Sequence, residues 1–239
     1  MSKKVFITGA SRGIGKAIAY AFAKEGCELY LLCKNNLVSM QKFADSLCRE
    51  YDIQAYCYAT DLADTAALET FLDMLPEMDV IINNAGISHV GLLTDMSLSQ
   101  WNEIMNVNLT STFLICQKLL PAMIRRRSGH IINISSVWGN VGASMEVAYS
   151  TTKGGMNSFT KALAKEVAPS NIQVNAIACG LIDTDMNACF TEEDLESVIA
   201  EIPADRMGRP EEVAKLCLQL VQAPEYLTGQ IIALDGGWI

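Results

Sequence analysis

Along almost the whole chain, short hydrophobic segments rich in β-branched residues alternate with segments whose hydrophobic residues recur at helical spacing. Strand-like segments fall at residues 5–8, 28–33, 53–58, 79–82, 130–134, 173–177 and 230–234. Helical spacing marks residues 14–25, 37–50, 65–74, 101–126, 148–167 and 211–222. Such alternation predicts an α/β fold, an open, doubly wound parallel sheet of about seven strands with helices on both faces.

We expect one domain over residues 1–239, because no linker rich in Pro, Gly or Ser interrupts the evenly spread hydrophobic residues.

One region breaks the alternation of strand-like and helical segments. Residues 180–209 contain no strand, only a short helix that opens at Thr191 and stops before Pro203. A long insertion between a strand end and the next helix is typical of a functional lid, and the alternative is an ordered surface excursion.

The composition excludes several classes of protein. A net charge of −9 argues against binding to nucleic acid or to anionic membranes, since both need a basic surface. The eight cysteines form no C-x-x-C pair, and neither histidine has a second ligand at metal-binding spacing, so we expect no metal site. Without a signal peptide or a run of about 18 apolar residues, the expectation is a cytoplasmic protein with no membrane segment.

The first strand-like segment ends in the glycine-rich turn Gly9-Ala10-Ser11-Arg12-Gly13-Ile14-Gly15, directly before a helical segment. Glycines here permit a tight turn, close approach of the backbone to a pyrophosphate and close packing of helix on strand. The helix N-terminus adds free N–H groups and the positive end of its dipole. The spacing is not that of a P-loop, and the alternative is a turn without a ligand. Its place in the chain favours a phosphate-binding loop.

Tyr149 and Lys153 lie four residues apart in the helical segment 148–167, so their side chains share one face. An ammonium fixed beside a phenol lowers the pKa of the phenol from about 10 toward neutral pH. This spacing therefore predicts Tyr149 as a general acid or base. Ser136 lies just beyond a strand-like segment, at the carboxyl edge of the sheet. Alone, a Tyr and a Lys at this spacing also fit an ordinary exposed helix face.

Taken together, the motifs resemble the short-chain dehydrogenase/reductase family, over nearly the whole chain. They are Thr8-Gly9-x-x-x-Gly13-x-Gly15, Asn83-Asn84-Ala85-Gly86, Asn108, Ser136, Tyr149-x-x-x-Lys153 and Asp235-Gly236-Gly237-Trp238. Their style is closest to the bacterial 3-oxoacyl-(acyl-carrier-protein) reductases of fatty acid biosynthesis. The resemblance implies a single Rossmann-type domain and an oxidoreductase that uses NADP(H) to reduce a carbonyl to a secondary alcohol.

The resemblance also implies a role for each catalytic residue. Tyr149 would protonate the forming alkoxide, and Ser136 would hydrogen-bond the carbonyl oxygen as negative charge develops there. Lys153 would bind the nicotinamide ribose and lower the pKa of Tyr149. Asn108 would hold a water molecule that links Lys153 to solvent.

Cofactor contacts are implied in several segments. They are Gly9, Ser11, Arg12, Gly13, Ile14, Gly15, Lys34, Asp61, Leu62, Asn84, Ala85, Gly86, Tyr149, Lys153, Ile182 and Thr184. Asp61 and Leu62 match the adenine-contacting position, residues 84–86 would lie against the adenosine ribose, and residues 182–184 would hold the nicotinamide carboxamide. One departure is Cys179 before Gly180, where the family has proline, which leaves the backbone before the lid freer.

The residues after the second strand-like segment predict NADPH rather than NADH. NAD-specific folds place Asp or Glu about 20 residues beyond the glycine loop, where it binds the ribose 2′-hydroxyl. This chain has Lys34-Asn35-Asn36 there and no acid. Lys34 and Arg12 together would face a 2′-phosphate, although each alone also fits a solvated loop residue.

A 3-oxoacyl thioester is the expected substrate. The alternatives are another carbonyl or alcohol (a sugar, a steroid, a small ketone or an amino-ketone on a modified protein) and a non-catalytic NADP-binding regulator. Trp138, Met145, Met186 and Phe190, together with Met96, favour an apolar pocket. The resemblance further implies a homotetramer, in which residues 101–126 and 148–167 pair between subunits.

The densest positive cluster, Arg125-Arg126-Arg127, ends a helical segment just before Gly129. One interpretation is that these cations complement the dipole of the helix C-terminus. The other is that an acidic acyl carrier protein docks on them, near the mouth of the site. The resemblance implies a basic residue at this helix end, but it also implies a second one where the chain has Pro169-Ser170-Asn171.

Overall fold

Parallel strands form the centre of the computed structural model, which describes residues 2–188 and 190–239. In this part of the chain seven strands make one sheet in the order β3-β2-β1-β4-β5-β6-β7. They are β1 (Lys4–Thr8), β2 (Glu28–Cys33), β3 (Ala55–Ala59), β4 (Val80–Asn83), β5 (Gly129–Ser136), β6 (Ile172–Cys179) and β7 (Ile231–Leu234). The predicted doubly wound sheet is confirmed, and each predicted strand is present to within two residues at either end.

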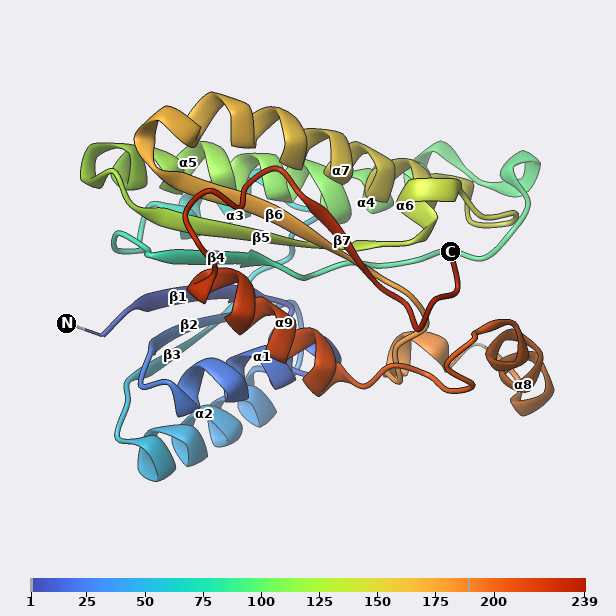
Figure 1. Ribbon diagram of the computed structural model, residues 1–239, viewed down its shortest axis with the longest axis horizontal. Helices are drawn as coiled ribbons and strands as arrows, with labels where there is room; N and C mark the ends of the chain where they lie inside the picture. The colour runs from blue at the N-terminus through green and yellow to red at the C-terminus, as the bar shows by residue number, and fades with distance from the viewer. Residues whose placement is uncertain (1, 189) are drawn as a thin grey trace.

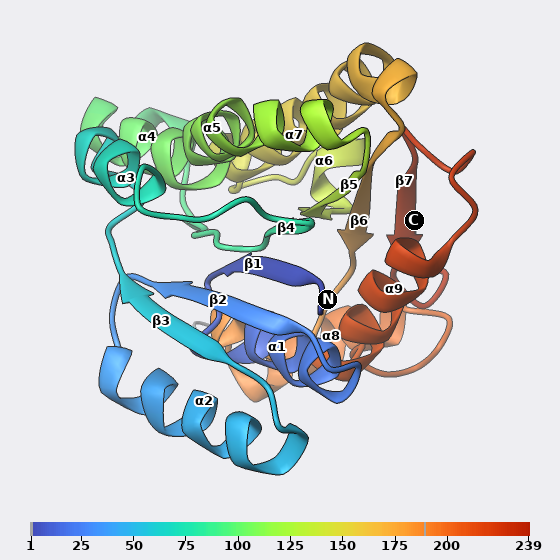
Figure 2. The same ribbon diagram turned by 90° about the vertical axis from the view of Figure 1, so that its left-hand side faces the viewer.

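Helices cover both faces of the sheet, as the end-on view in Figure 2 shows. One face carries α3 (Thr65–Leu72), α4 (Leu98–Met105), α5 (Ser111–Arg126) and α7 (Val147–Val167). The other carries α1 (Gly13–Lys24), α2 (Leu37–Tyr51) and α9 (Pro210–Gln222) (Figure 1). The predicted helix 101–126 begins earlier, at Leu98, and contains a π-helical turn (Asn106–Thr110) between α4 and α5.

Two hydrophobic cores lie on opposite sides of the sheet, because successive strand residues point to opposite faces. Phe6, Ile81 and Ile131 pack toward α3 and α5, whereas Ile7 and Ile132 pack toward α1 and α9. Burial on both faces explains why the strands read as continuous hydrophobic runs in the sequence.

The stretch Leu98–Arg126 is long enough to cross a membrane and has a mean hydropathy of 1.3. However, 61% of its most apolar window is buried within the fold. That degree of burial is typical of a core helix of a folded protein.

The predicted lid stands out from the body at the carboxyl ends of the strands, where Figure 1 shows α8 (Glu192–Glu201) projecting. As predicted, this helix starts after Thr191, whose hydroxyl accepts a hydrogen bond from the Asp194 backbone. A β-bridge between Ile182 and Gly208 ties the two ends of the lid together. Residue 189, inside the predicted lid, lies outside the described residues.

Short elements without a periodic signal were not predicted. They are α6 (Trp138–Val141) and the 3-10 turns Leu93–Asp95, Ala168–Ser170 and Asp185–Asn187.

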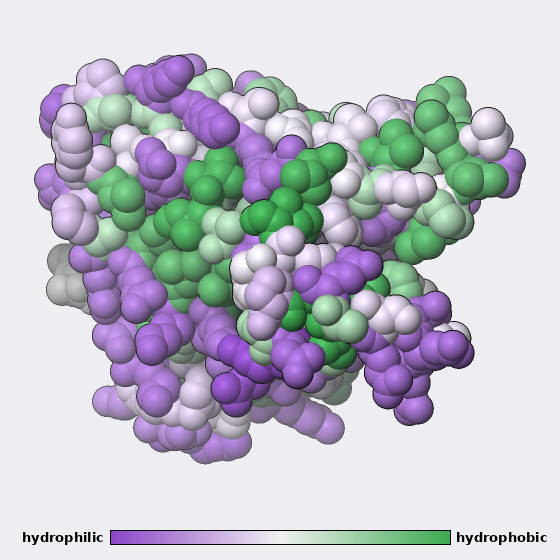
Figure 3. Space-filling view, turned by 45° about the vertical axis from the view of Figure 1, so that its right-hand side comes forward, coloured by the Kyte–Doolittle hydropathy of each residue, from purple (hydrophilic) through white to green (hydrophobic). Residues whose placement is uncertain are grey.

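In the space-filling view, hydrophobic side chains reach the surface in several groups, above a mostly hydrophilic surface on the α2 side (Figure 3).

Candidate active site

A cleft of about 1400 Å³ opens at the carboxyl ends of the strands, on the side of the lid. It brings together most of the predicted site residues. Those on its walls are Gly9, Ser11, Arg12, Gly13, Ile14, Lys34, Asp61, Leu62, Asn84, Ala85, Gly86, Ser136, Tyr149, Lys153, Ile182 and Thr184. Gly15 and Asn108 are the two predicted residues that do not line it.

The glycine loop leaves room that side chains would fill. Gly9 and Gly13 adopt φ values of 66° and 51°, a left-handed conformation that costs glycine little. A Cβ on Gly9 would lie 2.9 Å from the Asn84 amide nitrogen and 3.0 Å from the Ala85 Cα. A Cβ on Gly15 would collide with the Gly9 carbonyl oxygen, so Gly15 lets α1 pack against the loop. A bare backbone at a helix N-terminus fits the pyrophosphate of a dinucleotide.

Asn84 fastens this loop from the neighbouring strand. Its side-chain amide donates to the backbone oxygens of Thr8 (2.9 Å) and Gly9 (3.2 Å). In the other direction, the Thr8 hydroxyl accepts hydrogen bonds of 3.0 Å from the backbone N–H groups of Asn84 and Ala85. The Asn84 side chain, predicted to lie against the adenosine ribose, therefore also holds the β1 and β4 ends together.

Tyr149 and Lys153 are both buried on the face of α7 that meets β5. The Lys153 ammonium donates to the Ile134 carbonyl oxygen at 2.8 Å and lies 5.5 Å from the centre of the Tyr149 ring. Burial lowers the pKa of Lys153 to about 8. Burial also raises the pKa of Tyr149, and a hydrogen bond with Ser136 opposes that rise.

The raised pKa of Tyr149 is opposite to the lowered pKa predicted from the sequence. The correction has a physical reason: Lys153 points its ammonium at the Ile134 carbonyl and the ring face. Desolvation of the phenol is the largest cause of its raised pKa, and only the hydrogen bond with Ser136 acts in the other direction.

Asn108 lies in the π-helical turn, an irregularity that recurs at functional sites of helices. Its amide donates to the Ile87 carbonyl (2.9 Å) and to the Thr152 hydroxyl (3.1 Å), and its oxygen accepts from the Ile87 N–H (2.9 Å). Asn108 therefore joins the loop after β4 to α7 beside Lys153. Asn106, in the other register, donates instead to the Ala63 carbonyl.

One polar side chain near the site was missed by the sequence analysis. The Asn157 amide oxygen accepts from the Ser135 hydroxyl at 2.6 Å, and its nitrogen donates to the Asn140 amide oxygen at 2.9 Å. These bonds tie α7 to β5 and α6. A signal for it was present, since Asn157 continues the four-residue row of Tyr149 and Lys153 along the helix.

Both cations predicted for a 2′-phosphate line the cleft, and each is paired with a carboxylate. Arg12 lies 3.2 Å from Asp185 of the lid, and Lys34 lies 2.8 Å from Asp61. The hydrogen bond with Asp61 raises the pKa of Lys34. Burial tends to raise the pKa of Asp61, but the hydrogen bond from Lys34 lowers it overall.

The substrate side of the cleft is largely apolar. Trp138, Met145, Met186 and Phe190 line it as predicted, joined by Leu195 and Val198 of the lid helix, whereas Met96 does not. Within residues 2–188 and 190–239, no group of three His, Cys, Asp or Glu residues is placed to hold a metal ion.

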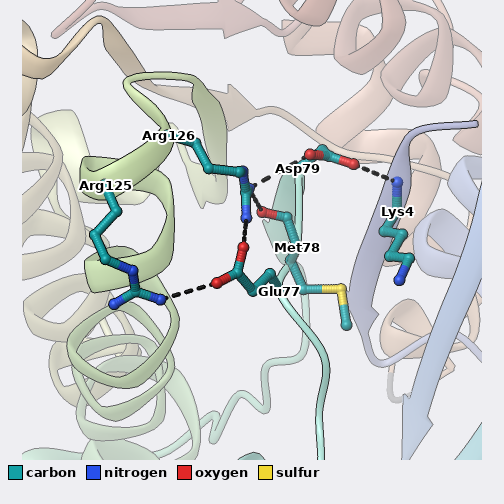
Figure 4. Close-up of polar contacts among 6 residues, drawn as sticks. All are labelled: Lys4, Glu77, Met78, Asp79, Arg125 and Arg126. Carbon is teal, nitrogen blue, oxygen red and sulfur yellow. Dashed lines mark hydrogen bonds and ion pairs between the residues drawn. The ribbon is translucent and has the colours of Figure 1, made fainter. Parts of the chain in front are cut away.

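The arginine cluster lies at the amino end of β5, opposite the cleft, so it is not at the mouth of this chain's own site. Figure 4 shows Arg125 and Arg126 both reaching Glu77, at 2.9 and 2.7 Å. Arg126 also donates to the Met78 carbonyl at 2.6 Å. Arg127 donates to the Pro169 carbonyl at 2.7 Å. These contacts give the cluster a structural role, as one of the two interpretations expected, but through Glu77, Met78 and Pro169, partners that sequence reasoning missed.

Comparison with known proteins agrees with this geometry. The family model for short chain dehydrogenases matches residues 3–195. The uncharacterized oxidoreductase YmfI of Bacillus subtilis is 40% identical, covering 100% of this chain and 99% of its own. The 3-oxoacyl-[acyl-carrier-protein] reductase FabG of Aquifex aeolicus is 40% identical over 98% of this chain and 96% of its own.

A solved structure from Beutenbergia cavernae, provisionally assigned as an NAD(P)-dependent gluconate 5-dehydrogenase with bound NADP, superimposes with a TM-score of 0.94. It is 31% identical, and the match covers 99% of this chain and 96% of that one. The fold, the residues of the cleft and the relatives all indicate the same family. The chain belongs to the short-chain dehydrogenase/reductase family of oxidoreductases.

Proposed function

We propose that the protein reduces a 3-oxoacyl thioester to the 3-hydroxyacyl thioester with NADPH, in the cytoplasm. The observation that carries the proposal is a single cleft with the glycine loop at one end, Ser136, Tyr149 and Lys153 in the middle, and an apolar wall beyond them. A long acyl chain suits such a wall, since its burial is favourable in proportion to its apolar area. The FabG relative, 40% identical, supports the same substrate class.

The choice of NADPH rests on the charges at the adenosine end of the cleft. Lys34 and Arg12 both line it, and no acid occupies residues 34–36, where a carboxylate would bind a ribose 2′-hydroxyl. The Beutenbergia relative, which holds NADP, supports this choice.

When bound, the nicotinamide supplies a hydride to the carbonyl carbon. The Ser136 hydroxyl donates a hydrogen bond to the carbonyl oxygen, which matters most as negative charge grows there. Because its pKa is raised, Tyr149 stays a neutral phenol and gives its proton to that oxygen. The Lys153 ammonium, fixed by the Ile134 carbonyl, then stabilises the phenolate that Tyr149 leaves behind.

A second candidate is a dehydrogenase of a sugar acid, which the Beutenbergia relative favours. One feature of the cleft disfavours it. Glu146 lines the cleft three residues before Tyr149 and accepts a hydrogen bond from the Ser88 hydroxyl. A carboxylate there would repel the carboxylate of a sugar acid.

The test is NADPH oxidation, followed by absorbance, with a panel of carbonyl compounds. We expect 3-oxoacyl thioesters to give the highest kcat/KM, and small ketones and keto sugar acids much lower values. A higher kcat/KM for a keto sugar acid would favour the second candidate. No turnover with any carbonyl, despite tight NADPH binding, would favour a regulator.

We also propose that the natural substrate is bound to an acyl carrier protein that docks at Arg125-Arg126-Arg127. Because these arginines lie opposite this chain's own cleft, a carrier docked there would serve the cleft of another copy in the tetramer proposed below. The test changes all three to alanine and compares a carrier-bound thioester with a small soluble one. Docking predicts a loss of kcat/KM for the carrier-bound substrate alone, smaller at high salt. Equal losses for both would show that the arginines serve only the fold.

Finally, we propose a homotetramer built through α4, α5 and α7. Hydrophobic side chains on these helices are exposed in the single chain, among them Leu98 (74%), Phe113 (45%) and Ile124 (41%). Burying them between copies would remove apolar surface from water. Light scattering at micromolar concentration tests this, and a monomer would refute it.

A further inference from the structure

Three charged side chains from separate elements meet on the cleft wall, at its adenosine end. Lys34 follows β2, Asp61 follows β3 and Glu103 lies on α4. The Lys34 ammonium is 2.8 Å from an Asp61 oxygen and 3.9 Å from a Glu103 oxygen. Each side chain is between 38% and 52% exposed, so all three are accessible from the cleft.

The carboxylates of Asp61 and Glu103 differ in their structural roles. Asp61 accepts a hydrogen bond from the Ala63 backbone N–H at 3.0 Å and so shapes the loop after β3. Glu103 at 3.9 Å from Lys34 is beyond hydrogen-bond distance. The N-terminus of α4 is capped by Ser97 and Gln100, without help from Glu103. In the described residues, the charge of Glu103 therefore acts on Lys34 without shaping the backbone.

The charge of Glu103 matters because it makes the net charge of this group of three side chains negative. Lys34 contributes one positive charge, whereas Asp61 and Glu103 contribute two negative charges. The only other predicted partner of a 2′-phosphate, Arg12, is paired with Asp185. A dianionic phosphate that approached Lys34 would thus meet a carboxylate as well as the ammonium, and like charges at such distances repel measurably.

We propose that Glu103 is a specificity-determining residue for the cofactor: it competes with the 2′-phosphate for Lys34 and weakens binding of NADP(H) relative to NAD(H). The inference rests on the proposed function, in which Lys34 faces the 2′-phosphate. Glu103 moderates the preference for NADPH without touching the residues that carry the chemistry. It lies four residues before Val107, which also lines the cleft, so it belongs to the same wall.

The test is titration calorimetry of the full chain with NADP⁺ and with NAD⁺. Glu103→Gln removes the charge and keeps the shape of the side chain. We expect its affinity for NADP⁺ to rise roughly threefold to tenfold, and its affinity for NAD⁺ to stay the same. At about 1 M NaCl, where the screening length is about 3 Å, the gain should shrink.

Glu69→Gln is the matched control, since it removes the same charge from α3 at an exposed position outside the cleft. Glu103→Lys is a second variant, and it should exceed the gain of Glu103→Gln because it adds a cation. Three results would overturn the inference: unchanged NADP⁺ affinity in both Glu103 variants, an equal gain for NAD⁺, or an equal gain in Glu69→Gln.

The proposed use of NADPH is judged separately, from the wild-type affinities. A wild-type preference for NAD⁺ would contradict the NADPH proposal. The inference about Glu103 would still be decided by the ratio of variant to wild type.

Discussion

Lys153 gives the sharpest prediction, because its charge is buried and serves no partner carboxylate among the described residues. Its ammonium donates a hydrogen bond to the neutral Ile134 carbonyl. Burial lowers its pKa from 10.5 to about 8. At about 1.4 kcal/mol for each pKa unit, holding this ammonium in the fold costs roughly 3 kcal/mol below pH 8.

Lys153→Met removes the charge and keeps a flexible side chain of similar shape. The variant loses the hydrogen bond to Ile134, worth about 1 kcal/mol. We therefore expect Lys153→Met to be more stable than the wild type by roughly 1 to 2 kcal/mol at pH 7, and to have almost no reductase activity.

The pH dependence supplies an independent check. Since the folded-state pKa of Lys153 is below its unfolded value, the unfolded chain binds more protons between pH 8 and pH 10.5. Wild-type stability therefore rises with pH across this window, and the advantage of Lys153→Met shrinks.

Urea unfolding at several pH values, without added nucleotide, measures this difference. Lys161→Met is the matched control, an exposed lysine on the same helix, and its effect should be small and independent of pH. A Lys153→Met variant that is less stable than the wild type at pH 7 would refute the reasoning.

Three further predictions concern the other contacts of the site and of the fold. Tyr149→Phe removes the proton donor, so kcat should fall by about 10² to 10⁴ while the calorimetric affinity for NADPH is unchanged; near wild-type turnover would identify another acid. Asn84→Ala removes both amide bonds to the glycine loop, so both the Tm and NADPH affinity should drop, and a lower Tm with unchanged affinity would limit Asn84 to the fold. Arg126→Ala removes the bonds to Glu77 and the Met78 carbonyl, so the free energy of unfolding should fall by about 1 kcal/mol, with unchanged kcat/KM for a small soluble thioester. Unchanged urea unfolding would show that these bonds contribute nothing to stability.

Features that depend on residues close together in the chain were predictable from the amino-acid sequence alone. The alternation of strand and helix segments predicted the seven-stranded sheet, because the spacing of hydrophobic residues differs between strand and helix. The glycine loop was predictable because tight turns and close packing need glycine at Gly9, Gly13 and Gly15. Tyr149 and Lys153 were placed on one face by helical geometry alone.

In contrast, which charged side chains pair and which polar groups are desolvated depends on how the whole chain folds. Arg12 pairs with Asp185, 173 residues further along the chain, and Arg126 pairs with Glu77 across the amino end of the sheet. No local pattern specifies such partners, since they depend on how the strands are ordered. The raised pKa of Tyr149 has the same origin: its sign follows from burial by every element packed around it, and burial is a property of the assembled fold.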